Sequence, residues 1–212
     1  MPLQIVAIFF ALIMLSACAS SSHSYTPARP IDFSTERIIP LPFDIVWDKY
    51  VEALSSSFFV INNISRDSRI INVSFSSSRP GEFVDCGYTQ RESYHPASGK
   101  QRFSYATADS STYNAGQKGS NIIWTVSRDA RLEGRANIYM MPRNNDATAI
   151  QVSSKYVWSV MTRGYSNLGA IAPSESSMID FSSSSQGTLP GPGGGITCVS
   201  KGALEKKMLN LI

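Results

Sequence analysis

The chain has 212 residues, of which 42% are hydrophobic and 17% are charged, and its 19 basic and 16 acidic residues give a net charge of +3. This length suits one domain with an ample hydrophobic core. The charged fraction is below the usual value of about a quarter, and the basic residues form no block, so the composition argues against nucleic-acid binding.

The first residues predict export across a membrane. Residues 5–15 are all apolar and lead into the quartet LSAC at 15–18. A run of this length is typical of a signal peptide and is short for a transmembrane helix, which needs about 20 residues. The quartet resembles the lipobox of bacterial lipoproteins, a family in which the cysteine thiol receives diacylglycerol, the chain is cut just before it, and the new amine is acylated. The resemblance implies a signal peptide over 1–17 and a lipidated Cys18 as the first mature residue.

The same resemblance indicates a location. Ala19 follows the cysteine, where an Asp resembles the inner-membrane retention signal of enterobacterial lipoproteins, so the periplasmic face of the outer membrane is favoured. Two or more acyl chains give a stable membrane anchor, because each buried CH₂ contributes ~0.8 kcal/mol and one chain alone binds only marginally. The opening MPLQ lacks the Lys or Arg typical of the family, which leaves an ordinary signal peptide or a buried N-terminal helix as alternatives.

Composition divides the rest of the chain into a tether and one domain. Residues 18–32 are rich in serine and contain two prolines, which predicts a flexible tether, and residues 33–212 form the domain. Within the domain, 87–120 and 165–195 lack hydrophobic periodicity. They therefore predict long irregular loops, the second of which ends in a stretch rich in Gly, Pro and Ser.

The first half of the domain predicts the order strand, helix, strand, strand. The segment 33–40 predicts a short strand that ends at Pro40. A helix is expected near 43–56, because apolar residues there recur at spacings of three and four and share one face. Strands are expected at 58–64 and 69–76, which are rich in β-branched and aromatic residues.

The second half predicts antiparallel strands and a terminal helix. Residues 121–164 alternate between apolar and polar positions and carry turn signals at 128–131 and 143–147, so a meander of three strands is expected. Residues 196–212 predict a strand followed by a helix.

The remaining cysteines predict a disulfide. With Cys18 lipidated, Cys86 and Cys198 remain as a pair, and an oxidising periplasm favours a bond between them. The alternative is two buried free thiols. No metal site is expected, because two cysteines and the distant His23 and His95 have no ligand spacing.

The stretch 38–76 carries a second resemblance. Its apolar-Pro lead-in, its helix with VW, the following strand, the acidic turn and the final IINV resemble the repeat of the BamC-type lipoprotein of the outer-membrane β-barrel assembly machine. The resemblance implies an α+β fold of the helix-grip type. In such a fold an antiparallel sheet carries the 43–56 helix and the C-terminal helix on one face.

Catalytic constellations are missing from the sequence. A catalytic serine needs a histidine base, but His23 lies in the expected tether and His95 in an expected loop. Glu82 and Asp85 predict a solvated ion cluster near a turn. We therefore expect no enzyme, no cofactor and no metal, but a membrane-anchored interaction or accessory subunit of an envelope assembly that binds a protein partner.

Aromatic residues are the candidate contacts. Those between 88 and 113 suit a surface that becomes ordered on a partner, and the alternative is a loop packed loosely on its own domain. A second hypothesis is a helix-grip module that encloses an apolar ligand between Trp124, Tyr139, Tyr156 and Trp158. The candidate contact residues are Tyr88, Tyr94, Phe103, Tyr105, Tyr113, Trp124 and Trp158.

Overall fold

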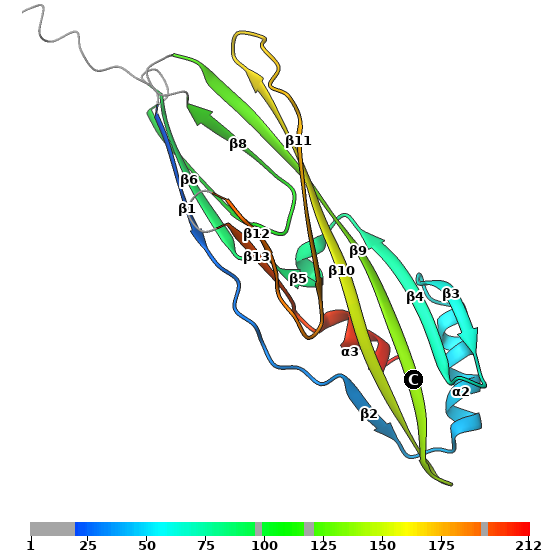
Figure 1. Cartoon of the computed structure of the whole chain (residues 1–212). Helices are drawn as coiled ribbons and strands as arrows, with labels where there is room; N and C mark the ends of the chain where they lie inside the picture. The colour runs from blue at the N-terminus through cyan, green and yellow to red at the C-terminus, as the bar shows by residue number, and fades with distance from the viewer. Residues whose placement is uncertain (1–19, 96–98, 117–120, 192–194) are drawn as a thin grey trace, which may run out of the picture.

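A long antiparallel hairpin runs through the whole molecule (Figure 1). Its strands are β9 (Ile123–Asn144) and β10 (Ala147–Ser166), which are 22 and 20 residues long. The computed structural model describes residues 20–95, 99–116, 121–191 and 195–212. The hairpin turn marks one end of the molecule, and the opposite end lies where β10 leaves the sheet.

Shorter strands pair with both edges of this hairpin, always antiparallel. On one edge, β10 pairs with β2 (Glu36–Ile39) and, further along, with β11 (Glu175–Ser182). On the other edge, β9 pairs with β8 (Ser111–Gly116) and with β4 (Ile70–Ser77), which in turn pairs with β3 (Val60–Ser65). The result is one elongated sheet.

One face of the sheet is covered along its length. Helices α2 (Phe43–Ser55) and α3 (Ala203–Leu209) cover the half near the hairpin turn. The 3-10 turn η1 (Pro80–Glu82) follows β4. Two small sheets cover the rest: β12 (Gly187–Leu189), β13 (Ile196–Ser200) and β5 (Val84–Asp85) in the middle, then β1 (Ser20–Thr26), β6 (Tyr88–His95) and β7 (Gly99–Ala106) at the far end.

The core follows from the two-residue side-chain period of a strand. Along β9, Leu132, Ile138 and Met140 are fully buried against the covering layer, whereas Glu133, Arg135 and Asn137, which alternate with the buried positions, are exposed. The helices lock to one another inside this core, because the Tyr50 hydroxyl donates a hydrogen bond to the Met208 carbonyl oxygen at 2.9 Å. Burial raises the pKa of the Tyr50 hydroxyl well above its ordinary value.

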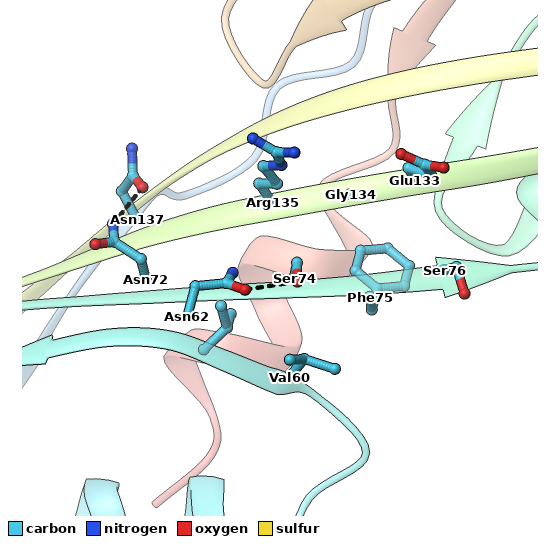
Figure 2. Close-up of a pocket in the computed structure, with 11 residues that line it drawn as sticks. Val60, Asn62, Asn72, Ser74, Phe75, Ser76, Glu133, Gly134, Arg135 and Asn137 are labelled. Carbon is cyan, nitrogen blue, oxygen red and sulfur yellow. Dashed lines mark hydrogen bonds between the residues drawn. The ribbon is translucent and has the colours of Figure 1, made fainter.

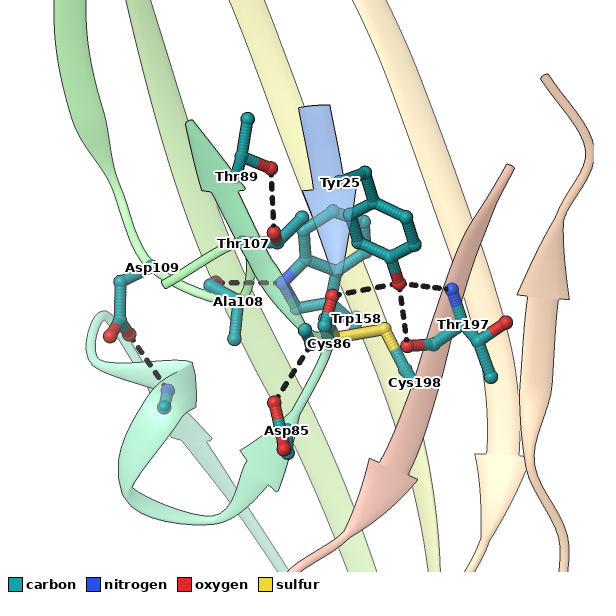
Figure 3. Close-up of a disulfide and its surroundings, with 12 residues drawn as sticks. Tyr25, Asp85, Cys86, Thr89, Thr107, Ala108, Asp109, Trp158, Thr197 and Cys198 are labelled. Atoms are coloured by element: carbon teal, nitrogen blue, oxygen red, sulfur yellow. Dashed lines mark hydrogen bonds between the residues drawn. A yellow bond between two sulfur atoms is a disulfide. The ribbon is translucent and has the colours of Figure 1, made fainter. Parts of the chain in front are cut away.

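The disulfide between Cys86 and Cys198 confirms the predicted pair (Figure 3). Both cysteines are fully buried. Beside them, the Tyr25 hydroxyl of β1 accepts a hydrogen bond from the Thr197 amide at 2.8 Å and donates to the Cys86 carbonyl oxygen at 3.1 Å. The Trp158 indole donates to the Ala108 carbonyl oxygen at 2.8 Å. The disulfide and these hydrogen bonds therefore join the two small sheets to the long hairpin at one place.

The predicted α+β, helix-grip fold is wrong. Strands make up 59% of the residues and helices 13%, and the described residues contain two α-helices. Among them, no helix combines the length and apolar composition needed to cross a bilayer. The order strand, helix, strand, strand over the first half is confirmed by β2, α2, β3 and β4, as is the terminal strand and helix.

The segments predicted as irregular loops and as a tether contain strands. Residues 87–120 contain β6, β7 and β8, residues 165–195 contain β11 and β12, and the expected tether contributes β1. The covered face of β6 carries Thr89, Arg91 and Ser93, so this strand lacks the apolar alternation by which strands are recognised.

The expected three-stranded meander is one hairpin. β9 continues through 128–131, because the Arg128 side chain turns inward and donates to the Thr107 carbonyl oxygen at 3.1 Å. The sequence predicts a turn at 128–131, but the chain continues there as one strand.

Removal of the disulfide should destabilise the domain strongly. For the Cys86→Ala, Cys198→Ala double variant we expect the free energy of unfolding to fall by about 2–5 kcal/mol, the usual loss for a native disulfide. Urea unfolding followed by circular dichroism measures this. Reductant should destabilise the wild type and leave the double variant unaffected, and an unchanged urea midpoint in both would contradict the clamping role.

Candidate binding site on the open sheet face

The face of the sheet opposite the core is not covered by any element of the described residues and is hollowed near the middle of β9 (Figure 2). The hollow has a volume of about 640 Å³ and lies over β3, β4 and β9. Its lining combines apolar surface from Val60, Val73 and Phe75 with the polar residues Asn62, Asn72, Ser74, Ser76, Glu133, Arg135 and Asn137.

A row of asparagine amides crosses three neighbouring strands at this hollow. Asn72 on β4 donates from Nδ2 to Oδ1 of Asn137 on β9 at 2.6 Å and accepts from Nδ2 of Asn63 on β3 at 3.5 Å. Beside this row, the Ser74 hydroxyl donates to Oδ1 of Asn62 at 3.2 Å. An amide group has two N–H donors and an oxygen with two lone pairs, so each member keeps bonding capacity toward solvent. Because paired strands hold the row, its geometry is preorganised for a ligand.

A like-charged pair lies next to the amide row. Arg135 on β9 is directly opposite Lys155 on β10. Like charges in directly opposite positions destabilise a sheet. In the described part of the chain neither residue forms an ion pair, and Glu133, the next outward residue of β9, forms none either. The pair therefore places two cations that form no ion pair in the described residues on the open face, next to the carboxylate of Glu133.

The functional groups of the hollow are of few kinds. The hollow contains amides, hydroxyls, one carboxylate and one guanidinium, but no histidine or thiol. Across the residues that the structure describes, no cluster of three or more His, Cys, Asp or Glu side chains could hold a metal ion. Glu82 pairs with Arg79 at 3.0 Å, and Asp85 accepts the Gly87 amide at 2.8 Å, so both serve local structure.

The aromatic residues predicted as one contact surface separate into two sets. Tyr88 and Tyr94 point outward from β6, and each is 42% exposed. Phe103, Tyr105 and Tyr113 point inward, between the sheet of β1, β6 and β7 and the long sheet. The inward set fills the domain and is not available as a flat contact surface.

Two arginines complete the inward set. The Tyr105 and Tyr113 rings stack with centroids 5.8 Å apart, Arg91 lies 4.3 Å over Tyr113, and Arg128 lies 5.0 Å over Tyr105. Burial raises the pKa of the Tyr113 hydroxyl and lowers the pKa of the Arg128 guanidinium. Cation–π contacts and main-chain acceptors hold these cations, so the cluster joins the two sheets.

The remaining candidates belong to the core or lie outside the described residues. Trp158 is fully buried, as is Tyr156, and Trp124 is half-buried on the covered face. Tyr139 lies on the opposite face from Trp158, so these aromatic residues do not enclose one apolar ligand. Cys18 lies outside the described residues.

Sequence reasoning missed the open face, although a signal was present. Asn72 and Ser74 were recognisable as the polar side of the strand at 69–76, and the same alternation continues through Arg135 and Asn137. Only the pairing of β3, β4 and β9 brings these residues together.

The chain matches no protein-family model, no curated protein and no solved structure. The site is therefore judged on its own geometry.

Relief of the like-charge contact should stabilise the protein. For Lys155→Thr we expect the free energy of unfolding to rise by about 0.2–1 kcal/mol, because the repulsion with Arg135 is lost. Arg163→Thr is the matched control for strand propensity, since Arg163 lies on the same strand and face but opposite Ser127.

Urea unfolding at low and high salt measures both variants. The advantage of Lys155→Thr over Arg163→Thr should shrink at high salt, because salt screens exposed charges. Equal effects of the two substitutions would contradict repulsion at this pair.

Proposed function

We propose that this protein is a lipid-anchored, non-catalytic subunit of a bacterial envelope assembly. Cys18 attaches it to the periplasmic face of the outer membrane, and the open sheet face binds a protein partner. The observation that carries the binding role is the hollow at the amide row, where preorganised polar groups and two cations that form no ion pair in the described residues face solvent.

Two observations support the proposed location. The LSAC quartet at 15–18 resembles a lipobox, which supports acylation of Cys18. The buried Cys86–Cys198 disulfide is typical of proteins that fold in an oxidising compartment, such as the periplasm.

The open face indicates the chemistry of the partner. Arg135 and Lys155 favour an acidic side chain, and the amide row favours groups that both donate and accept hydrogen bonds. Along β9 the outward charges alternate in sign from Asp129 to Arg135, so a partner must present the complementary order. Because this surface is polar and exposed, the complex would be salt-sensitive.

Acylation is tested by metabolic labelling with a fatty-acid analogue. The wild-type chain should carry the label and fractionate with the outer membrane, while Cys18→Ser should carry none. An unlabelled wild-type chain would contradict the proposed anchor.

Site-specific crosslinking in cells tests the binding role. A photoreactive residue in place of Ser76, which lines the hollow and leaves the amide row intact, should capture one acidic partner. The same residue in place of the exposed Glu52 on α2 is the control and should capture none. Capture at position 76 should disappear with Arg135→Glu, because the charge reversal repels an acidic partner. Equal capture at both positions, or capture that survives Arg135→Glu, would contradict docking on the open face.

A further inference from the structure

The loop between β10 and β11 carries the two most exposed large hydrophobic side chains of the described residues. Leu168 is 74% exposed and Ile171 is 71% exposed. This segment, residues 166–172, is called the apical loop below. From Gly164 to Ser174 the chain contains no charged residue. Isolated exposed aliphatic residues are common on protein surfaces, so exposure alone assigns no role.

Many backbone groups of the apical loop form hydrogen bonds within the loop. The Ser166 hydroxyl accepts the amides of Leu168 at 3.3 Å and Ala170 at 2.9 Å, and the Ser166 amide donates to the Ala170 carbonyl oxygen at 2.8 Å. The Gly169 amide donates to the Ser166 carbonyl oxygen at 3.0 Å, and Gly169 has a φ of +83°, which glycine adopts without strain.

Asn167 ties the apical loop to the start of β9. Its amide donates to the Ile123 carbonyl oxygen at 2.9 Å, its Oδ1 accepts the Ile123 amide at 3.1 Å, and its Nδ2 donates to the Asn121 carbonyl oxygen at 3.3 Å. Unpaired backbone groups are the main cost of placing a loop in an apolar medium. Here these amides are paired within the protein, while Leu168 and Ile171 remain outside.

The chain enters the domain at this same end. β1 begins at Ser20, which pairs with Tyr94, and Figure 1 places the start of β1 and the apical loop at the end opposite the hairpin turn. Because β1 starts at Ser20, only Ala19 lies between it and Cys18, a span of two residue steps. A fully extended chain spans about 3.5 Å per residue, so a lipidated Cys18 lies within about 7 Å of the domain.

Exposed tyrosines surround this end. Tyr94 on β6 is 42% exposed, and Tyr165, next to the apical loop, is 48% exposed. Tyrosine is enriched at the boundary between lipid and water, because its ring is apolar and its hydroxyl is polar.

We propose that the apical loop is a second membrane contact, which inserts Leu168 and Ile171 into the bilayer interface beside the lipidated Cys18. The proposal rests on the anchor in the proposed function. An amphipathic segment of this kind reaches about 5–10 Å into the headgroup and acyl boundary, a depth similar to the spacer length. The long hairpin would then extend away from the membrane, with its apical end at the bilayer. Its 22-residue strand β9 places the hairpin turn about 70 Å from the apical end.

Tryptophan quenching by brominated lipids tests this contact. The full-length acylated protein is reconstituted in phosphatidylethanolamine–phosphatidylglycerol vesicles with brominated acyl chains, and the emission of the wild type is subtracted. The added tryptophan of Leu168→Trp should lose about half or more of its emission relative to vesicles without bromine, because it lies in the interface. Ile171→Trp is a second reporter in case the first variant folds poorly.

Phe58→Trp is the matched control. Phe58 is 61% exposed and lies between α2 and β3, where the neighbouring Val60 is in register with Ser74 and the middle of β9, so its replacement should keep its emission. Mass spectrometry of the N-terminal peptide from the same samples reports acylation of Cys18. Acylated protein without quenching at positions 168 and 171 would overturn the membrane contact and leave the anchor intact. Absence of acylation would overturn both proposals.

Discussion

The two-residue period of the long hairpin is the constraint on which the rest of the structure depends. In β9 and β10, successive side chains point to opposite faces, and apolar residues predominate on one face, where Arg128, Thr148 and Ser154 are buried polar exceptions. That face needs a cover, which the helices and the two small sheets supply from segments far apart in the sequence. The other face receives the intervening residues, and no element of the described part of the chain covers it. A single pattern thus produces both the core and the open face on which the amide row lies.

The disulfide fixes how that cover is assembled. β5 and β13 are short strands that could not hold together alone, yet Cys86 and Cys198 link them beneath the hairpin. Tyr25 adds β1 to the same point, and Trp158 adds β10. Because the first strand is held here, almost no free chain separates the domain from Cys18. The proposed acylation of Cys18 would therefore give the protein a defined orientation on a membrane, with the open face upright and accessible from the side.

The sequence was sufficient for parts of the structure where apolar periodicity is strong. The helix around Trp47 and Tyr50, the strand pair that follows and the terminal helix carry such patterns, and their predictions are confirmed. The disulfide followed from counting cysteines, a constraint that does not depend on periodicity. Strands with polar residues on both faces were not predicted from the sequence, because β6 turns Thr89 and Ser93 inward and β1 is mostly serine.

The candidate site could not be located from the sequence for a related reason. Asn63, Asn72 and Asn137 are ordinary polar residues of three strands, and a register between strands far apart in the sequence is needed to align them. Part of the predicted aromatic surface lies inside the domain instead, while Tyr88 and Tyr94 stay exposed. Tyr105 and Tyr113 are typical of contact surfaces, but arginines stack on them inside the domain.

Oxidative footprinting of methionines in intact cells tests most directly whether the open face is covered by a partner. Met178 and Met161 lie on the open face of β11 and β10 and are 59% and 39% exposed, whereas Met140 is fully buried. In the purified protein, Met178 and Met161 should oxidise readily while Met140 stays unmodified. In cells, docking on the open face predicts slow oxidation of Met178 and Met161. Oxidation of these two residues at the same rate in cells and in the purified protein would contradict it.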